Sequence, residues 1–203
     1  MRIKSFIYIS LSSIFFISCK LTNEELINEG VRLADHKKYK EAIKVYTKAI
    51  KRNHKLQLAY YDRGFCFKEL KDYSNALRDF NRVIDLQTYG DFIFIENPNT
   101  PFASEEAKMQ VSYDDALYQR AQVKFFMDSL RSAFHDFQIL IDKSYELRSN
   151  CILWQGAILI NENKKDNACE YFGKAKQLAS SENEKREADE MIKTYCGQAS
   201  NNR

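Results

Sequence analysis

A shift of 34 residues places the segment 23–56 on the segment 57–90 with matching side chains. The matched pairs are Gly30 with Gly64, Tyr39 with Tyr73, Ala42 with Ala76, Tyr46 with Phe80, and Ile50 with Ile84. A period of this length is typical of repeat proteins in which each unit is a helical hairpin that buries its apolar side against its neighbours. The repeated part of the chain is therefore expected to form one continuous stack.

The apolar residues of the first unit predict an amphipathic second helix. They recur at steps of three and four residues: Ala42, Ile43, Tyr46, Ala49 and Ile50. Gly30 and Gly64 lie inside the first helix of their units, where glycine costs about 1 kcal/mol relative to alanine. A costly residue at the same position of both units predicts close approach of the two helices, with Ala42 or Ala76 as the small residue opposite.

These positions resemble the tetratricopeptide repeat family, whose motif is W-x2-L-G-x2-Y…A-x3-F…P. Unit one supplies Leu26, Gly30, Leu33, Ala42 and Tyr46, and unit two supplies Tyr60, Gly64, Phe67, Ala76 and Phe80. His54 and Thr88 stand where the family has its closing proline. The resemblance implies an all-α, right-handed solenoid of about four helix-turn-helix repeats with a C-terminal capping helix.

The same pattern continues beyond residue 90 after one interruption. Repeats three and four are predicted at 114–147 and 149–182, so that the solenoid spans 23–182 with an insertion at about 88–112. Alanine replaces the glycine in repeat three, at Ala121. Ser181 or Asn183 could cap a last helix at 183–196, and 197–203 is expected to be a disordered tail.

The N-terminus reads as a targeting segment. Arg2 and Lys4 precede an apolar run from Phe6 to Ser18, which is too short to span a membrane and suits a signal peptide over 1–18. The following Cys19 resembles the lipidation site of bacterial lipoproteins, so 19–22 would be an acylated N-terminus and short linker. An ordinary cleaved signal peptide with a chance cysteine, or an uncleaved anchor, are the alternatives.

The lipoprotein resemblance implies a place in the bacterial cell envelope. Lys20 follows the cysteine instead of the aspartate that resembles an inner-membrane retention signal, which favours an outer-membrane lipoprotein, facing the periplasm or the exterior. The abundant Lys, Asn, Ile, Phe and Tyr suggest an AT-rich genome such as that of a Bacteroidota bacterium. The membrane would then be reached through the lipid, with palmitate as a common acyl chain.

Four further cysteines could form disulfides in an oxidising envelope, and four cysteines allow three complete pairings. The repeat geometry favours one bridge. Cys169 lies early in the second helix of repeat four, and Cys196 ends the capping helix that should stack on it. Cys66 is interpreted as a small buried apolar residue.

No catalytic or metal-binding motif is present in the sequence, and no cofactor or metal is expected. His36, His54 and His135 are isolated, and the acidic pairs Glu105-Glu106 and Asp114-Asp115 read as first-turn helix charges. Without Arg2 and Lys4 the charge of the chain is close to neutral, which argues against nucleic acid as a partner. Short basic runs such as Lys37-Lys38 are interpreted as solvated helix faces.

The family resemblance places a partner-binding groove on the first helix of each repeat. In repeat one the corresponding residues are Ile27, Asn28 and Val31, so the basic and amide clamp of the chaperone-binding members is absent. The remaining candidates are mostly aromatic and polar, with two aliphatic residues in repeat four: Tyr61, Asp62, Phe65, Glu69, Tyr118, Gln119, Gln122, Phe126, Leu153, Trp154 and Ala157. Aromatic residues are favoured as anchors at interfaces.

The insertion carries both prolines, Pro98 and Pro101, and the apolar run Phe92, Ile93, Phe94 and Ile95. It could fold back into the groove, which we favour, or extend the first helix of repeat three from Ser104 and present the run to a partner.

The sequence as a whole predicts a non-enzymatic scaffold for a peptide or protein partner. The alternative is an accessory subunit of an outer-membrane assembly, secretion or nutrient-capture complex.

Overall fold

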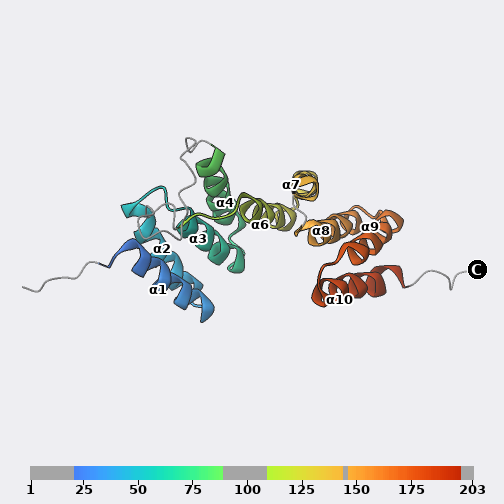
Figure 1. Cartoon of the computed structure of the whole chain (residues 1–203), viewed down its shortest axis with the longest axis horizontal. Coiled ribbons are helices and arrows are strands. Elements are labelled where there is room, and N and C mark those ends of the chain that lie inside the picture. Colours follow the sequence, from blue (N-terminus) through green and yellow to red (C-terminus); the bar gives the residue numbers. More distant parts are fainter. Residues whose placement is uncertain (1–20, 89–108, 144–145, 198–203) are drawn as a thin grey trace, which may run out of the picture.

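The helices follow one another along the long axis of the molecule, from α1 at one end to α10 at the other (Figure 1). The computed structural model describes residues 21–88, 109–143 and 146–197. Within these ranges every regular element is a helix, as the sequence predicts for an all-α solenoid. Among these described helices, each one packs on the next.

Repeats one and two each form a helical hairpin. Their helices are α1 (Asn23–Asp35), α2 (Tyr39–Arg52), α3 (Gln57–Glu69) and α4 (Tyr73–Thr88). A capping box starts α1: the Glu25 backbone N–H donates to the Thr22 hydroxyl, and the Thr22 N–H donates to the Glu25 carboxylate at 2.7 Å. The capping box therefore fixes the start of α1 directly after Thr22.

Repeats three and four and the cap complete the stack. Their helices are α6 (Tyr113–Phe126), α7 (Leu130–Lys143), α8 (Arg148–Asn161), α9 (Lys165–Leu178) and α10 (Glu182–Met191). Ser112 caps α6 by accepting from Asp114 N–H, and Ser181 caps α10 by accepting from Glu184 N–H. Of the two N-caps that the sequence left open for the last helix, Ser181 is thus the one used. Asp114 and Asp115 lie in the first turn of α6, where negative charge is favourable.

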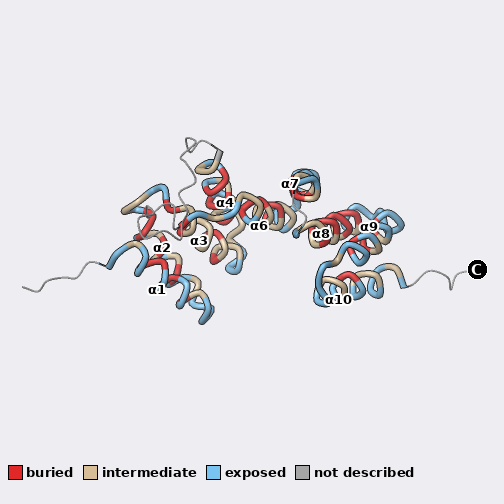
Figure 2. The backbone as a smooth tube through the Cα atoms, in the orientation of Figure 1, coloured by how far each residue is buried: buried red, intermediate tan, exposed pale blue. Residues whose placement is uncertain are grey.

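The interior is a series of small cores between neighbouring helices instead of one large core (Figure 2). One aromatic residue of the second helix is fully buried in every repeat: Tyr46, Phe80, Phe137 and Phe172. These are the matched positions of the 34-residue period. The period is therefore set by packing between the two helices of each repeat.

The glycines of the first helices make room for these aromatic rings. A Cβ atom on Gly30 would lie 2.4 Å from Cε1 of Tyr46, and one on Gly156 would lie 2.4 Å from Cε1 of Phe172. The expectation that Ala42 is the residue opposite Gly30 is therefore wrong: the ring of Tyr46, one turn further along α2, fills that space. The close approach is between backbone and ring.

The end of the insertion returns to the start of repeat two. Leu58 N–H donates to the Met109 carbonyl at 3.0 Å, and Val111 N–H donates to Oε1 of Gln57 at 3.2 Å. Met109 is buried in the core that contains Ile27. Residues 109–112 are not helical and α6 begins only at Tyr113, so repeat three does not have a first helix that runs continuously from Ser104.

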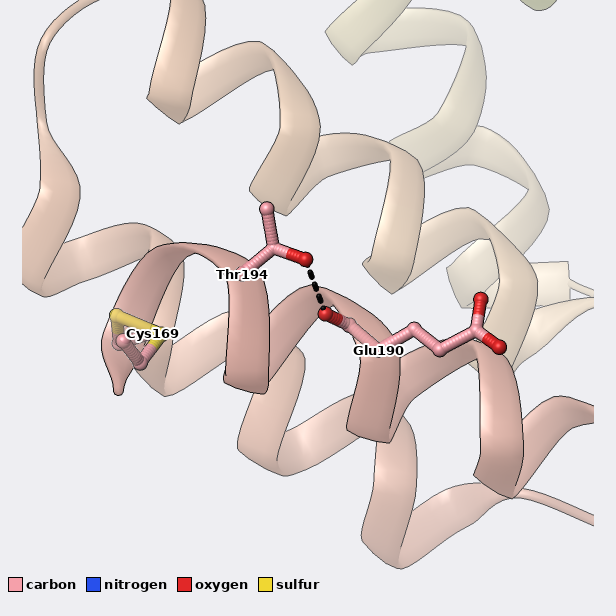
Figure 3. Close-up of a disulfide and its surroundings, with 4 residues drawn as sticks. Cys169, Glu190 and Thr194 are labelled. Carbon is pink, nitrogen blue, oxygen red and sulfur yellow. Dashed lines mark hydrogen bonds between the residues drawn. A yellow bond between two sulfur atoms is a disulfide. The ribbon is translucent and has the colours of Figure 1, made fainter. Parts of the chain in front are cut away.

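A disulfide joins the cap to repeat four. Cys169 of α9 and Cys196 are bonded, with Cα atoms 5.8 Å apart. Cys196 does not end an α-helix, because α10 passes into a π-helix over Ile192–Cys196. The Thr194 hydroxyl donates to the Glu190 carbonyl at 2.7 Å, which gives that carbonyl a partner beside the wider turn (Figure 3).

Several predicted features lie outside the described residues. They are the signal peptide at 1–18, the lipidation site Cys19, the apolar run Phe92–Ile95 and residues 198–203 of the tail. In the part of the chain that the structure describes, no helix is both long enough and apolar enough to cross a membrane.

Candidate functional site

The first helices of the repeats, α1, α3, α6 and α8, carry all the predicted binding residues outside the insertion. We call the surface they form the first-helix face. The helices α1 and α3, and α3 and α6, touch directly. Side chains of α3, α6 and α8 are also joined by hydrogen bonds across the repeat boundaries, so residues far apart in the sequence meet on this face.

A lysine bridges repeats two and three. The Lys68 ammonium donates to Oε1 of Gln119 at 2.6 Å and to Oε1 of Gln122 at 2.9 Å, and it lies 5.1 Å from the ring centre of Phe65. Burial lowers its pKa. Lys68 holds two predicted residues in place but was not itself predicted. The signal available in the sequence was its position one turn after Phe65.

Trp154 is the centre of an aromatic cluster between repeats three and four. Its ring stacks on Phe137 at 6.0 Å between centres, and its Nε1–H donates to the Tyr118 hydroxyl at 3.0 Å. Phe125 and Phe126 meet it edge to face at 5.2 and 5.9 Å. Trp154 and Tyr118 are half-buried, so both hold the helices together as well as border the face.

Phe126 is the predicted anchor that is most available to a partner. It is 45% exposed and stacks on Tyr73 of α4 at 5.4 Å. A large aromatic ring held by a second ring on one side and open to solvent on the other can contact an apolar partner side chain with little loss of conformational entropy.

Asp62 is the charged residue of α3 whose environment is most altered. Burial raises its pKa to about 7, although the Tyr46 hydroxyl donates a hydrogen bond to it. Its Oδ2 atom is buried and has no partner among the described residues. At neutral pH this carboxyl is consequently divided between its protonated and ionised forms.

The remaining predicted residues differ from one another in how far they are exposed. Tyr61 packs edge to face on Phe80 at 5.7 Å, and burial raises its pKa to about 12. In repeat one, Ile27 is buried in the core, whereas Asn28 and Val31 are exposed. Leu153 and Ala157 of α8 are half-buried. The exposed part of the face is therefore polar or weakly apolar in repeat one and aromatic around Phe126.

Comparison with known proteins gives the architecture. A tetratricopeptide repeat family profile matches residues 58–87. The structure is similar to MamA (residues 41 to the end) from Desulfovibrio magneticus RS-1, with a TM-score of 0.61 and 19% identity over 77% of this chain and 75% of that one. It is also similar to YrrB, described as a protein with an unusual peptide-binding site, with a TM-score of 0.55 and 16% identity over 87% and 79% of the two chains. The chain therefore has the fold of a tetratricopeptide-repeat solenoid, and residues 58–87 match the profile of that family.

A known protein is similar in sequence to 63 residues of this solenoid, a shorter part of the chain than the solved structures cover. Hsp70-Hsp90 organizing protein 1 of Glycine max is 40% identical over 63 residues, which are 31% of this chain and 11% of that protein. The match thus covers a small part of a much longer protein.

Buried ion pairs join the two helices of repeat two to each other, and likewise the two helices of repeat three. Arg63 contacts Asp79 through two hydrogen bonds of 2.7 Å, and Arg120 contacts Asp136 at 2.8 and 2.9 Å. Each aspartate side chain is only 2% exposed and lies 16 residues after its arginine. Sequence reasoning missed these pairs, although equal spacing in two repeats was a visible signal. These contacts occupy both arginines and connect the two helices of each repeat.

The described part of the tetratricopeptide solenoid offers little for catalysis. Burial raises the pKa of the Cys66 and Cys151 thiols to about 12, so neither is a nucleophile at neutral pH. No group of three or more potential metal ligands occurs among the described residues. Two surface hollows of about 370 and 320 Å³ lie along α4 and α10, and neither is lined by a predicted binding residue.

Proposed function

We propose that this chain is a non-enzymatic scaffold that binds a peptide or protein partner on the first-helix face, between α3 and α8. The observation that carries the proposal is the aromatic cluster around Trp154, from which Phe126 remains 45% exposed. Lys68, Gln119 and Gln122 stiffen the same surface, because their hydrogen bonds fix α3 against α6. A rigid surface with an exposed aromatic anchor loses little entropy when it binds.

The partner is a protein or peptide in this proposal because a solenoid offers an extended surface and few enclosed cavities. The similarity to YrrB, whose description includes a peptide-binding site, supports this choice of partner. We do not propose a chaperone partner on the basis of the organizing protein, because Ile27 and Val31 stand where the chaperone-binding clamp has basic and amide residues.

We further propose that the chain is a lipoprotein of a bacterial envelope, acylated at Cys19 and attached to the outer membrane. The support is the basic start, the apolar run and the small residue before the cysteine. Mass spectrometry of the mature N-terminus tests this directly. An N-terminus other than an acylated Cys19 would overturn it.

The binding surface is tested by photo-crosslinking in the producing cell. A photoreactive amino acid replaces Gln122 on the first-helix face, and a matched variant carries it at Lys174 on the exposed side of α9. We expect a crosslinked partner from position 122 and none from position 174.

The same experiment with Phe126→Ala should lose the crosslink at position 122, because the anchor is gone. Leu178→Ala is the matched control, since Leu178 is an exposed apolar residue of α9 that takes no part in the aromatic cluster. Equal crosslinking from positions 122 and 174, or a crosslink that survives Phe126→Ala, would show that the first-helix face is not the binding surface.

A further inference from the structure

The outer side of α2 carries a continuous line of positive charge. Eight of the 31 lysine and arginine residues of the chain fall in the segment 36–55, where Glu41 is the single acidic residue. The net charge of the whole chain is only +3, so the rest of the chain is net acidic. Although the net charge of the chain is small, positive charge is therefore concentrated in the segment 36–55.

Four lysines form one stripe on this helix. We call Lys40, Lys44, Lys48 and Lys51 the α2 lysine stripe. At 3.6 residues per turn they lie within an arc of about 80° and extend over about 16 Å. All four are exposed, and the buried residues Ala42, Tyr46, Ala49 and Ile50 occupy the opposite side of α2. No ion pair among the described residues involves any of the four.

The repeat does not require this stripe. At the matching positions of repeat two stand Ser74, Arg78, Arg82 and Asp85, and at those of repeat four stand Asp166, Glu170, Lys174 and Gln177. These helices pack in the same way on their own first helices without four like charges. Since like charges spaced four residues apart destabilise a helix slightly, folding alone gives no reason for the stripe.

The last residue of the stripe, Lys51, directly precedes Arg52, which contacts the start of the described chain. The Arg52 guanidinium at the end of α2 donates to the carbonyl of Leu21. Cys19 precedes Leu21 by two residues, which span at most about 7 Å of extended chain. A lipid on Cys19 would consequently hold this end of α2 within about one Debye length of the bilayer surface.

We propose that the α2 lysine stripe docks on the anionic lipid headgroups of the membrane that holds the lipid anchor. The inference rests on the proposed lipid anchor for its setting. The lysine stripe would give the lipidated protein a second contact with the membrane, because a basic patch next to a lipid anchor strengthens binding to anionic lipids. With α2 on the bilayer, its buried side faces α1 and α3, so the first-helix face is directed away from the lipid and stays open to a partner.

The test uses the unacylated solenoid, residues 20–203, which contains every described helix. Vesicles of 30% phosphatidylglycerol in phosphatidylcholine are compared with vesicles of phosphatidylcholine alone in a sedimentation assay at about 0.1 M salt. The stripe variant replaces all four lysines of the stripe by glutamine, which has a similar helix propensity. The matched control removes four exposed positive charges elsewhere: Arg131, Lys165, Lys174 and Lys193, each to Gln.

We expect the wild-type solenoid to bind the anionic vesicles and not the neutral ones, and to be released at about 0.5 M salt. The stripe variant should bind up to roughly a thousandfold more weakly, and the control variant no more than about threefold more weakly. Circular dichroism verifies that both variants fold.

Three results would overturn the proposal: no binding of the wild type to anionic vesicles, equal losses in the two variants, or binding to duplex DNA or an acidic protein in place of vesicles. Because the vesicle assay contains no acyl chain, its outcome is independent of the mass spectrometry that tests the anchor. Failure of one can therefore be told from failure of the other.

Discussion

Adding one methyl group at Gly156 tests whether glycine is kept in the first helices for packing. Gly156 lies inside α8, where alanine favours the helix by about 1 kcal/mol. However, a Cβ atom there would lie 2.4 Å from Cε1 and 2.7 Å from Cδ1 of Phe172, a ring with no exposed surface. The ring or the helix must move, and forced overpacking costs about 1–3 kcal/mol.

Gly173 provides the matched control. It lies inside α9, next to Phe172, and a Cβ atom there would have no heavy atom within 4 Å. Gly173→Ala should therefore stabilise the solenoid by up to about 1 kcal/mol. Gly156→Ala should be about neutral to about 2 kcal/mol destabilising, because the packing cost offsets the same helix gain. The difference between the two variants, about 1–3 kcal/mol, isolates the packing term.

The assay is thermal unfolding followed by circular dichroism and by the emission of Trp154. Trp154 is the single tryptophan of the chain and lies two residues before Gly156, so its emission reports on α8 directly. A change of 1 kcal/mol corresponds to about 2–4 °C in Tm for a cooperative chain of this size. If Gly156→Ala raises the Tm as much as Gly173→Ala, the reasoning is refuted. Phe172→Leu in the Gly156→Ala background should recover part of the loss.

Two further predictions concern the cap and the buried acid. Cys169→Ser removes the disulfide that links residues 27 positions apart, and should lower the free energy of unfolding by about 3.5 kcal/mol in the chain-entropy model, measured by urea unfolding. A reductant should destabilise the wild type equally and leave the variant unchanged. A wild type that the reductant does not affect would contradict this. Asp62 binds its proton more tightly in the folded chain, so its stabilising contribution is complete below its ordinary pKa of 3.8 and is lost as the pH rises to about 7. Asp62→Asn should accordingly stabilise the chain at pH 8 by about 1–4 kcal/mol and have little effect near pH 4. If the substitution shifts the Tm equally at pH 8 and at pH 4, burial of the charge is not the cause.

The sequence predicted the helices well because both periodicities of the fold, that of the helix and that of the repeat, can be recognised in the order of residues along the chain. The steps of three and four residues define the buried side of each helix, and the 34-residue period defines the hairpin. The fully buried rings of Tyr46 and Phe80 are a matched pair of that period. The small residues Gly30 and Gly64 were likewise visible, although the sequence paired them with Ala42 and Ala76 instead of with the rings. These features depend on contacts within one hairpin, between residues fewer than 20 positions apart.

The candidate site was predicted only in part, because its chemistry lies between repeats. The sequence selected Gln119, Gln122 and Trp154 by position, but Lys68 joins the two glutamines from 51 and 54 residues away. Likewise, nothing in the sequence showed that Trp154 stacks on Phe137 while Phe126 stays exposed. Both outcomes depend on the angle at which α3, α6 and α8 follow one another.

By itself, then, the sequence determined the repeat, the buried side of each helix and the small and aromatic positions that pack within a hairpin. The tertiary structure alone decided which polar atoms pair across helices, where Met109 at the end of the insertion is buried, and that a π-helix carries Cys196 to Cys169. The physical reason is that periodic burial is a local property of the chain. Hydrogen bonds, ring contacts and a disulfide depend on distances of a few ångströms between separate elements, and only the packed stack sets those distances.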